Sequence, residues 1–392
     1  MAIKPYACPD VRTEDIDAVC DVLKSQFLTT GPKVPELESV FSKYVDAKQS
    51  VACGNGTQAL HLASLAIGLK PGDKVIVPAM TFLATANAVR MCGADVVFSD
   101  VDPDTGIMTL DNLKEAASRA GGGVVAVYPV HIGGHVADME ALSTYARAKG
   151  WKIVEDACHA LGGDSQGHKI GNCAYSDMAC FSLHATKSFT SCEGGVITTN
   201  NTEFADRMRI LRNHGMHRDG EMTNLDLAQD ENGKPNPWYY EMHEVGNNYR
   251  LSDVHAALAI CQLSRMDEVR ARRQEIETRY RNELKNISPY LRCVEPVRKD
   301  NSLLHLFQVL IDFEGVGKSR ADICQALLEK EVGTQVHYIP VAWQPYYVAL
   351  YGKPELVGAK AFYERILALP FYSSLSDEDV GDVIQAVKQV LS

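Results

Sequence analysis

The stretch Lys152-Ile153-Val154-Glu155 is a short, mostly apolar run that is followed at once by the polar turn Asp156-Ala157-Cys158-His159. Similar runs, separated by helical patterns, recur between residues 48 and 197: Ser50–Cys53, Lys74–Val77, Val96–Phe98, Val124–Val127 and Met178–Ser182. Short runs that alternate with helices are typical of a parallel sheet whose two faces are both covered. We therefore predict an α/β large domain with a mostly parallel central sheet between helices.

The second half of the chain changes pattern twice. Residues 201–284 are mostly helical, with a long charged stretch from Asp253 to Lys285, and a polar insertion at 226–237 predicts an ordered loop or flap. Beyond about Pro289, strand-like runs at 304–311 and 335–338 mix with helical patterns at 319–331 and 377–391. We predict an N-terminal arm (1–30), a large domain (31–285), and a small α+β C-terminal domain (286–392) that the arm completes.

The composition is that of an ordinary globular chain, with 392 residues, 46% of them hydrophobic, and a formal net charge of −11. This acidic balance gives no reason to expect nucleic acid as a partner, and no apolar run approaches the roughly 18 residues that span a bilayer. The 11 cysteines include no C-x-x-C pair, which fits neither a disulfide framework nor a zinc site. We expect a soluble, cytoplasmic protein with no metal, membrane or nucleic-acid partner.

A glycine-rich turn, Gly54-Asn55-Gly56-Thr57-Gln58, follows the first predicted strand and opens an apolar-periodic helix. Amide groups exposed at a helix N-terminus bind phosphate well. A plain strand-to-helix turn would also use glycine and a threonine cap, so the segment alone fits either role. It matches neither the dinucleotide fingerprint nor a P-loop.

Asp156 ends a strand that is otherwise apolar. A buried carboxylate without a partner is costly, so we expect a cationic partner. One candidate is the protonated pyridine nitrogen of pyridoxal phosphate, because an ion pair keeps that ring able to accept electrons from a carbanion. The alternative is that Asp156 caps a helix.

Lys187 closes the segment Ser182-Leu183-His184-Ala185-Thr186-Lys187, again at a strand end. Apolar neighbours would remove water from its amine, lower its pKa and make the neutral form available for an imine bond. The alternative is a solvated surface lysine. The separation of 31 residues (187 − 156) permits a pocket shared with Asp156.

Phe82 follows the predicted strand that ends at Val77. An aromatic ring at this point could lie flat on a cofactor ring. The alternative is a plain core residue.

Taken together, these segments resemble the DegT/StrS family of sugar aminotransferases over nearly the whole chain. The matching motifs are Leu28–Pro32, Asn55–Leu60, Pro78–Thr85, Glu155–Ala160, and Phe181–Lys187 with Glu193–Gly195. The resemblance implies a fold-type I enzyme that uses pyridoxal phosphate (PLP), with Lys187 as its Schiff-base lysine and general acid–base. Relatives that replace this lysine with histidine are sugar dehydratases, so a chain that keeps Lys187 is expected to be a true aminotransferase.

The resemblance also implies roles for other residues. The cofactor-binding residues would be Gly56, Thr57, Gln58, Phe82, Asp156, His159, Ser182 and, from the neighbouring subunit, Asn248. The substrate-binding residues would be His184, Arg250, His337 and Tyr338. Because Asn248 would reach across, each active site would need two chains, and an obligate homodimer is expected.

Within the family, Pro237–Tyr240, Val336–Pro340 and Gln344–Tyr347 most resemble the enzymes of pseudaminic-acid synthesis. That likeness implies L-glutamate as amino donor and a UDP-linked 4-keto-6-deoxy-N-acetylhexosamine as acceptor, for lipopolysaccharide, flagellin glycan or sialic-acid-like sugars. The alternative acceptor is a 3-keto sugar, or a keto-sugar that is linked to GDP or dTDP in place of UDP. One rival function is that of a non-catalytic PLP-binding regulator, which a DNA-binding segment would distinguish, and no such segment is visible. The other is a nicotinamide-dependent dehydrogenase, and the glycine fingerprint that such an enzyme carries is absent from the sequence.

Overall fold

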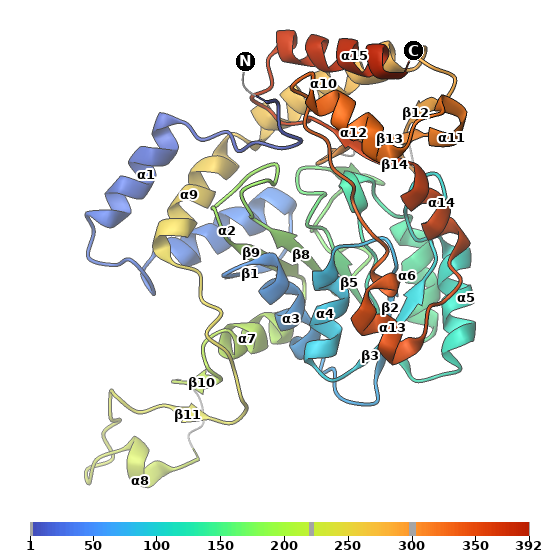
Figure 1. The fold of residues 1–392 in the computed structure, drawn as a ribbon. Coiled ribbons are helices and arrows are strands. Elements are labelled where there is room, and N and C mark those ends of the chain that lie inside the picture. Colours follow the sequence, from blue (N-terminus) through green and yellow to red (C-terminus); the bar gives the residue numbers. More distant parts are fainter. Residues whose placement is uncertain (1–2, 219–222, 298–302, 392) are drawn as a thin grey trace.

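The computed structural model describes residues 3–218, 223–297 and 303–391. A seven-stranded sheet with the order β1-β9-β8-β5-β4-β2-β3 lies at the centre of the large domain (Figure 1). Its strands are β1 Gln49–Cys53, β2 Lys74–Pro78, β3 Asp95–Ser99, β4 Val124–Val127, β5 Lys152–Asp156, β8 Met178–Ser182 and β9 Gly195–Thr199. β9 is antiparallel to both neighbours, and the other pairs are parallel. The predicted mostly parallel sheet is confirmed, and the six predicted strands end within one residue of the observed ones.

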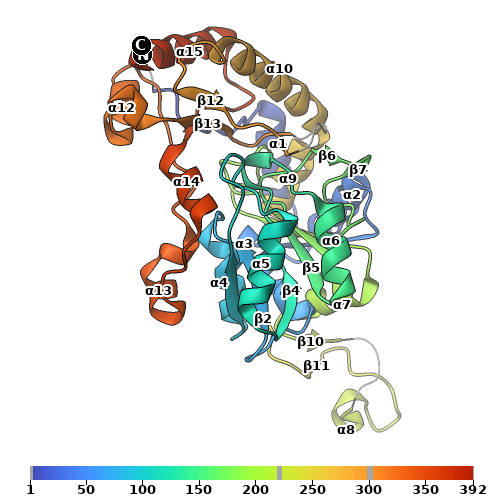
Figure 2. The same cartoon turned by 90° about the vertical axis from the view of Figure 1, so that its right-hand side faces the viewer.

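Helices cover both faces of this sheet (Figure 2). Successive side chains of a strand point to opposite faces. In β1, Val51 packs in one hydrophobic core with helix α3 (Gly56–Ala66), whereas Ala52 packs in another with α2 (Lys33–Val45) and α9 (Asp253–Ser264). The strands are therefore apolar on both faces, which explains why they read as continuous runs.

The remaining elements of the large domain are short. They are α1 Thr13–Leu23, α4 Leu83–Met91, α5 Leu110–Ala120, the 3₁₀ turn Ile132–Gly134, α6 Met139–Ala148, β6 Asp164–Ser165, β7 His168–Lys169 and α7 Thr202–Leu211. Side-chain caps fix several helix starts: Asp138 accepts from the N–H of Ala141, and Asn201 accepts from that of Glu203. α1 packs against α9 and so joins the N-terminal arm to the large domain.

The small domain has an antiparallel sheet of β12 Leu291–Cys293, β13 Phe307–Ile311 and β14 Ile366–Leu369. Its helices are α11 Phe313–Val316, α12 Arg320–Leu328, the 3₁₀ turn Val341–Trp343, α13 Pro345–Tyr351, α14 Val357–Arg365 and α15 Asp377–Leu391. Ile276, Tyr280 and Leu284 of α10 (Met266–Leu284) lie in the same hydrophobic core. We propose on this ground that the domain boundary falls inside α10 and not at residue 285.

The predicted strand at 335–338 is wrong. Only Gln335 pairs, through two backbone hydrogen bonds with Ala368 of 3.2 and 2.8 Å. The next residues leave the edge of β14 and line a cavity with their side chains. Because residues 336–338 turn away from β14, they lie beyond hydrogen-bonding reach of the strand that Gln335 pairs with.

A long arm projects from the large domain in both views (Figures 1 and 2). It contains β10 Met216–His217, α8 Leu225–Ala228 and β11 Glu241–Met242, and the insertion predicted at 226–237 forms part of it. Large apolar side chains stand exposed on it, among them Leu227, Trp238, Tyr240, Met242 and Val245. Exposed apolar side chains that gather on one projecting segment are typical of interaction surfaces.

No helix among the described residues is both long enough and apolar enough to cross a bilayer.

Candidate active site

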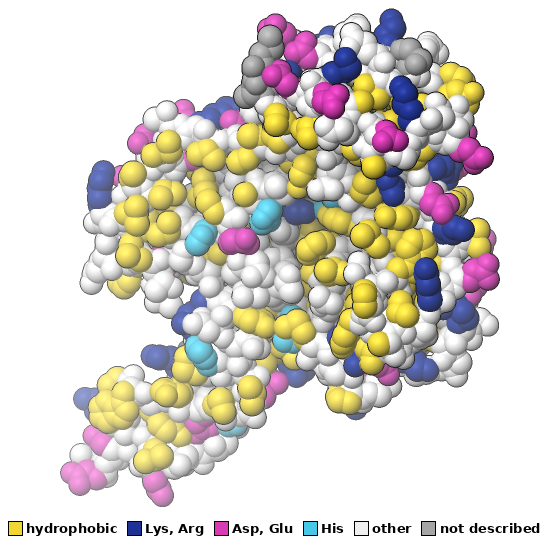
Figure 3. Space-filling view, in the orientation of Figure 1, with side chains coloured by type: hydrophobic (Ala, Val, Ile, Leu, Met, Phe, Trp, Pro, Cys, Tyr) yellow, Lys and Arg dark blue, Asp and Glu magenta, His cyan; other side chains and the backbone are white. Residues whose placement is uncertain are grey.

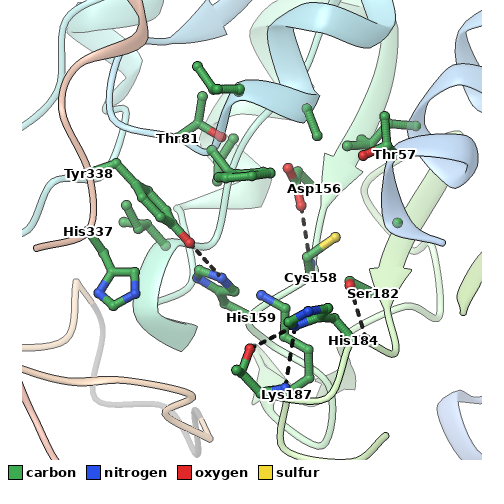
Figure 4. A pocket seen from close by; sticks show the side chains of 18 of the residues that line it. Thr57, Thr81, Asp156, Cys158, His159, Ser182, His184, Lys187, His337 and Tyr338 are labelled. Carbon is green, nitrogen blue, oxygen red and sulfur yellow. Dashed lines mark hydrogen bonds between the residues drawn. The ribbon is translucent and has the colours of Figure 1, made fainter. Parts of the chain in front are cut away.

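A cavity of about 690 Å³ opens where β5 and β8 end, between the two domains (Figures 3 and 4). Asp156 and Cys180 are direct partners in these adjacent parallel strands, so polar residues that follow both strands meet here. Ten of the residues singled out from the sequence line the cavity: Gly56, Thr57, Phe82, Asp156, His159, Ser182, His184, Lys187, His337 and Tyr338.

Three of the residues singled out do not line it. The side chain of Gln58 turns back, and its Oε1 lies only 2.6 Å from where a Cβ on Gly54 would stand. Asn248 is exposed at the base of the arm, where it forms a bridge with Asn213. Arg250 donates to Asn213 Oδ1 at 2.6 Å. Gln58, Asn248 and Arg250 therefore lie outside the cavity lining of this chain, and their roles at a cofactor or substrate stay predictions.

The glycine-rich turn forms an anion cradle. Asn55 caps α3 by accepting from the N–H of Gln58 at 2.9 Å, which leaves the first amides of the helix facing the cavity. A Cβ on Gly56 would lie 2.8 Å from the Cβ of Ser182, so only glycine permits this close approach. The side chains of Thr57 and Ser182 stand on the same side of the cavity (Figure 4). A phosphate fits this corner.

Asp156 is 6% exposed and its carboxylate is held from two sides. Thr85 donates to Oδ2 at 2.6 Å, and the backbone N–H of Cys158 donates to Oδ1 at 3.2 Å. The residues that follow form turns and no helix, so the alternative of a helix cap is wrong. Both of these donors are neutral, so the buried carboxylate suits a cationic ligand in addition.

Lys187 is half-buried and lines the cavity, so it is not a solvated surface charge. Burial lowers the pKa of its amine, and the nearby Cys158 and Asp156 oppose that shift only in part. A larger fraction of neutral amine is therefore present than in a free lysine, as a nucleophile or proton acceptor requires.

His159 connects the two domains through hydrogen bonds. The N–H of Gly133 donates to its Nδ1 at 3.1 Å, so the ring proton is on Nε2, which lies 3.4 Å from the hydroxyl of Tyr338. Figure 4 shows this last contact beside the amine of Lys187.

Three imidazoles in and under the cavity are neutral. Burial, together with the nearby charge of Lys187, lowers the pKa of His159 and His305 well below the usual value and that of His337 to about 4. The rings of His159 and His305 lie 4.6 Å apart. This wall can donate and accept hydrogen bonds without carrying charge at neutral pH.

Phe82 immediately precedes α4 and is 53% exposed, which is unlike a core residue. Its ring lies 5.6 Å from that of Tyr338 at the cavity wall. An exposed aromatic face in this position is available to a planar ring.

Sequence reasoning missed several residues of the site. Thr81 bonds to Thr85 at 2.6 Å and so supports the hydroxyl that holds Asp156. Two threonines four residues apart in an apolar segment are a weak signal for such a pair. Tyr6 and His305 also contribute, but both come from distant parts of the chain and carry no local signal.

The arrangement defines a class of enzyme. An anion cradle, a buried carboxylate, a desolvated amine and an exposed aromatic ring fit the phosphate, the pyridine nitrogen, the aldehyde and the ring face of PLP respectively. Among the described residues, no group of three or more His, Cys, Asp or Glu side chains is placed so that it could hold a metal ion.

Comparison with known proteins gives the family. The model of the DegT/DnrJ/EryC1/StrS aminotransferase family matches residues 9–388, and the chain belongs to this family. The chain is 38% identical to the spore coat polysaccharide biosynthesis protein SpsC of Bacillus subtilis over 393 residues, which covers 99% of this chain and 97% of SpsC. It is therefore a PLP-dependent sugar aminotransferase and not a nicotinamide-dependent dehydrogenase.

Solved structures agree with this assignment. Helicobacter pylori PseC, described as an aminotransferase involved in the biosynthesis of pseudoaminic acid, superimposes with a TM-score of 0.89 at 26% identity over 99% of both chains. The sugar aminotransferase Spr1654 of Streptococcus pneumoniae superimposes in its PLP form with a TM-score of 0.86 at 28% identity, over 99% of this chain and 98% of that one. Its pyridoxamine phosphate (PMP) form superimposes with a TM-score of 0.87 at 30% identity, with the same coverage.

Proposed function

We propose that this enzyme transfers the amino group of L-glutamate to C4 of a UDP-linked 4-keto-6-deoxy-N-acetyl sugar, for a cell-surface glycan or a sialic-acid-like sugar. The observation that carries the proposal is the neutral wall of imidazoles and aromatic rings around Lys187, which suits a sugar ring with few charges and one methyl group. The likeness to PseC, described as an aminotransferase of pseudoaminic-acid biosynthesis, supports an acceptor sugar of that kind. We infer a cytoplasmic enzyme because all 11 cysteines are free thiols.

Each side chain has a defined task in this proposal. Bound PLP supplies an electron sink for the carbon that loses a proton. Lys187 would accept the α-proton of glutamate in the first half-reaction and would donate a proton to the sugar carbon in the second. Asp156 would hold the pyridine nitrogen in its protonated form, while Thr57 and Ser182 would hold the phosphate. Because donor and acceptor use the same cavity in turn, kinetics should be ping-pong.

A panel of keto-sugars tests the acceptor. We expect release of 2-oxoglutarate from glutamate with UDP-4-keto-6-deoxy-N-acetylhexosamine, with kcat/KM at least about tenfold above that for 3-keto, GDP-linked or dTDP-linked sugars, because a wrongly placed carbonyl or base forfeits hydrogen bonds. If one of those sugars gave a higher kcat/KM, the proposed acceptor would be wrong and that sugar would be the acceptor. The absence of turnover with every sugar would contradict glutamate as the donor.

We also propose that two chains build each site. Among the described residues that line the cavity, Lys187 is the only lysine or arginine, although the acceptor brings a pyrophosphate. Asn248 and Arg250 lie outside their own cavity and contact Asn213, just before β10 where the arm begins. The arm projects from the chain and exposes apolar side chains (Figure 1). A second copy that receives this arm would gain Asn248 at the cofactor phosphate and Arg250 at the substrate, in an obligate homodimer.

Mixing two inactive variants tests the shared site. Asn248→Ala and Lys187→Ala should each be poorly active, and a mixture should regain roughly a quarter of wild-type activity, because about half of randomly exchanged dimers are mixed and each holds one intact site. Exchange is verified by mass spectrometry of differently tagged chains. If the chains exchange and no activity returns, Asn248 acts within its own chain and the shared site is wrong.

A further inference from the structure

The N-terminal segment is fixed to the small domain by its backbone. The N–H of Lys4 donates to the carbonyl of Glu331 and the N–H of Gly333 donates to that of Lys4, both at 2.8 Å. The N–H of Phe371 then donates to the carbonyl of Tyr6 at 3.1 Å. This segment therefore has a defined course that ends at the cavity.

The side chain of Lys4 strengthens this attachment. It is 7% exposed, and its Nζ lies 3.0 Å from Asp382 and 3.6 Å from Asp379, both near the start of α15. A buried lysine that pairs with two carboxylates is costly to leave unpaired, so the segment is held in one position. Tyr6 lies two residues further on.

The ring of Tyr6 belongs to the cavity wall. It lines the cavity and packs against His337, with 5.2 Å between ring centroids and an angle of 58°. Burial and the charge of Asp156 raise the pKa of Tyr338, and Tyr6 adds to this effect. The ring of His337 thus lies between the two phenols, because its centroid is 4.9 Å from that of Tyr338 as well.

His337 and the Tyr6 ring that packs on it lie away from the part of the cavity that suits the cofactor phosphate. His337 and Tyr338 stand on the side of the cavity opposite Thr57 and Ser182, which form the phosphate corner (Figure 4). Tyr6 packs against His337 and so lies on that far side, where the part of a substrate that extends beyond the reacting carbon must go.

We propose that Tyr6 is a positioning residue for the sugar of the acceptor, to which its hydroxyl donates or from which it accepts a hydrogen bond, and that it does not act on the amino donor. This inference rests on the proposed sugar aminotransferase function. A sugar presents hydroxyl, amide and carbonyl groups, and a phenol can both donate to and accept from them. The donor instead presents two carboxylates, which bind best to cations, and the neighbouring His337 is neutral.

The two half-reactions can be measured separately in Tyr6→Phe, which keeps the ring and removes only the hydroxyl. Conversion of the PLP form by glutamate should stay within about twofold of wild type. Consumption of the pyridoxamine form by the keto-sugar should lose roughly threefold to tenfold in kcat/KM, mainly through KM, as expected for one hydrogen bond. Binding of UDP-N-acetylglucosamine, which has no keto group, should weaken by a similar factor in calorimetry.

Matched variants separate positioning from folding. Tyr290→Phe removes a hydroxyl from an exposed tyrosine of the small domain that does not line the cavity, and both half-reactions should remain unchanged. Lys4→Met should reproduce the selective loss in the sugar half-reaction, since it loosens the segment that carries Tyr6. Equal losses in both half-reactions, or none in either, would overturn the role of Tyr6. Failure of the wild-type enzyme to react with the sugar would instead overturn the proposed function.

Discussion

Lys187→Ala should lower turnover by at least about a thousandfold while the protein stays folded. The variant loses both the covalent attachment of the cofactor and the group that moves the proton, and proton transfer by a positioned side chain alone contributes roughly 10²- to 10⁴-fold. Turnover is followed by 2-oxoglutarate release, and folding by circular dichroism and thermal unfolding. Lys24→Ala, at an exposed lysine after α1, is the matched control and should be fully active.

The attachment itself can be located in the wild-type enzyme. The purified protein should be yellow, and borohydride should make the bond between cofactor and lysine permanent. Peptide mapping should then find the added mass on Lys187. A label on another lysine would remove the central assignment, because the low pKa that burial gives Lys187 would then serve a different purpose.

Asp156→Asn should retain the cofactor and lose roughly 10- to 100-fold in kcat. The amide can still accept from Thr85 or from the N–H of Cys158, but it no longer carries the charge that keeps the pyridine nitrogen protonated. Hydrogen bonds to charged groups contribute about 1.5–3 kcal/mol, which corresponds to this range. Single-turnover absorbance changes with glutamate measure the step directly.

A second aspartate provides the comparison. Asp111→Asn changes a carboxylate on the surface, where it pairs with Lys114 at 3.6 Å, and should leave kcat within experimental error. If Asp156→Asn turned over at the wild-type rate, the carboxylate would serve only the turn that begins at Cys158.

The sheet and the centre of the site could be predicted because their signals are local. Each strand is an apolar run that ends in a polar turn, and adjacent parallel strands bring their ends together. Asp156 and the segment that carries Lys187 therefore reach the same cavity. The insertion at 226–237 could be predicted only as an ordered loop or flap. The course of the long arm that contains it depends on contacts with other segments, which the sequence of the insertion does not reveal.

The other residues depend on tertiary structure. Gln58 matches its motif, yet its side chain turns toward Gly54 and away from the cavity. The segment at 335–338 has the composition of a strand, but the requirement to bring His337 to the cavity removes it from the sheet. Tyr6 enters the site only through contacts with residues more than 300 positions later, which no window of sequence reveals.

The same contacts set an order of events when the protein is made. The partners of Lys4 and Tyr6 are Glu331, Gly333 and Phe371, which leave the ribosome long after the first residues have emerged. The large domain can fold during synthesis, whereas the beginning of the chain must wait for its end before the cavity wall closes. A truncated or stalled chain would thus carry the sheet and the reactive lysine with an open wall, and complete synthesis is a condition for a complete active site.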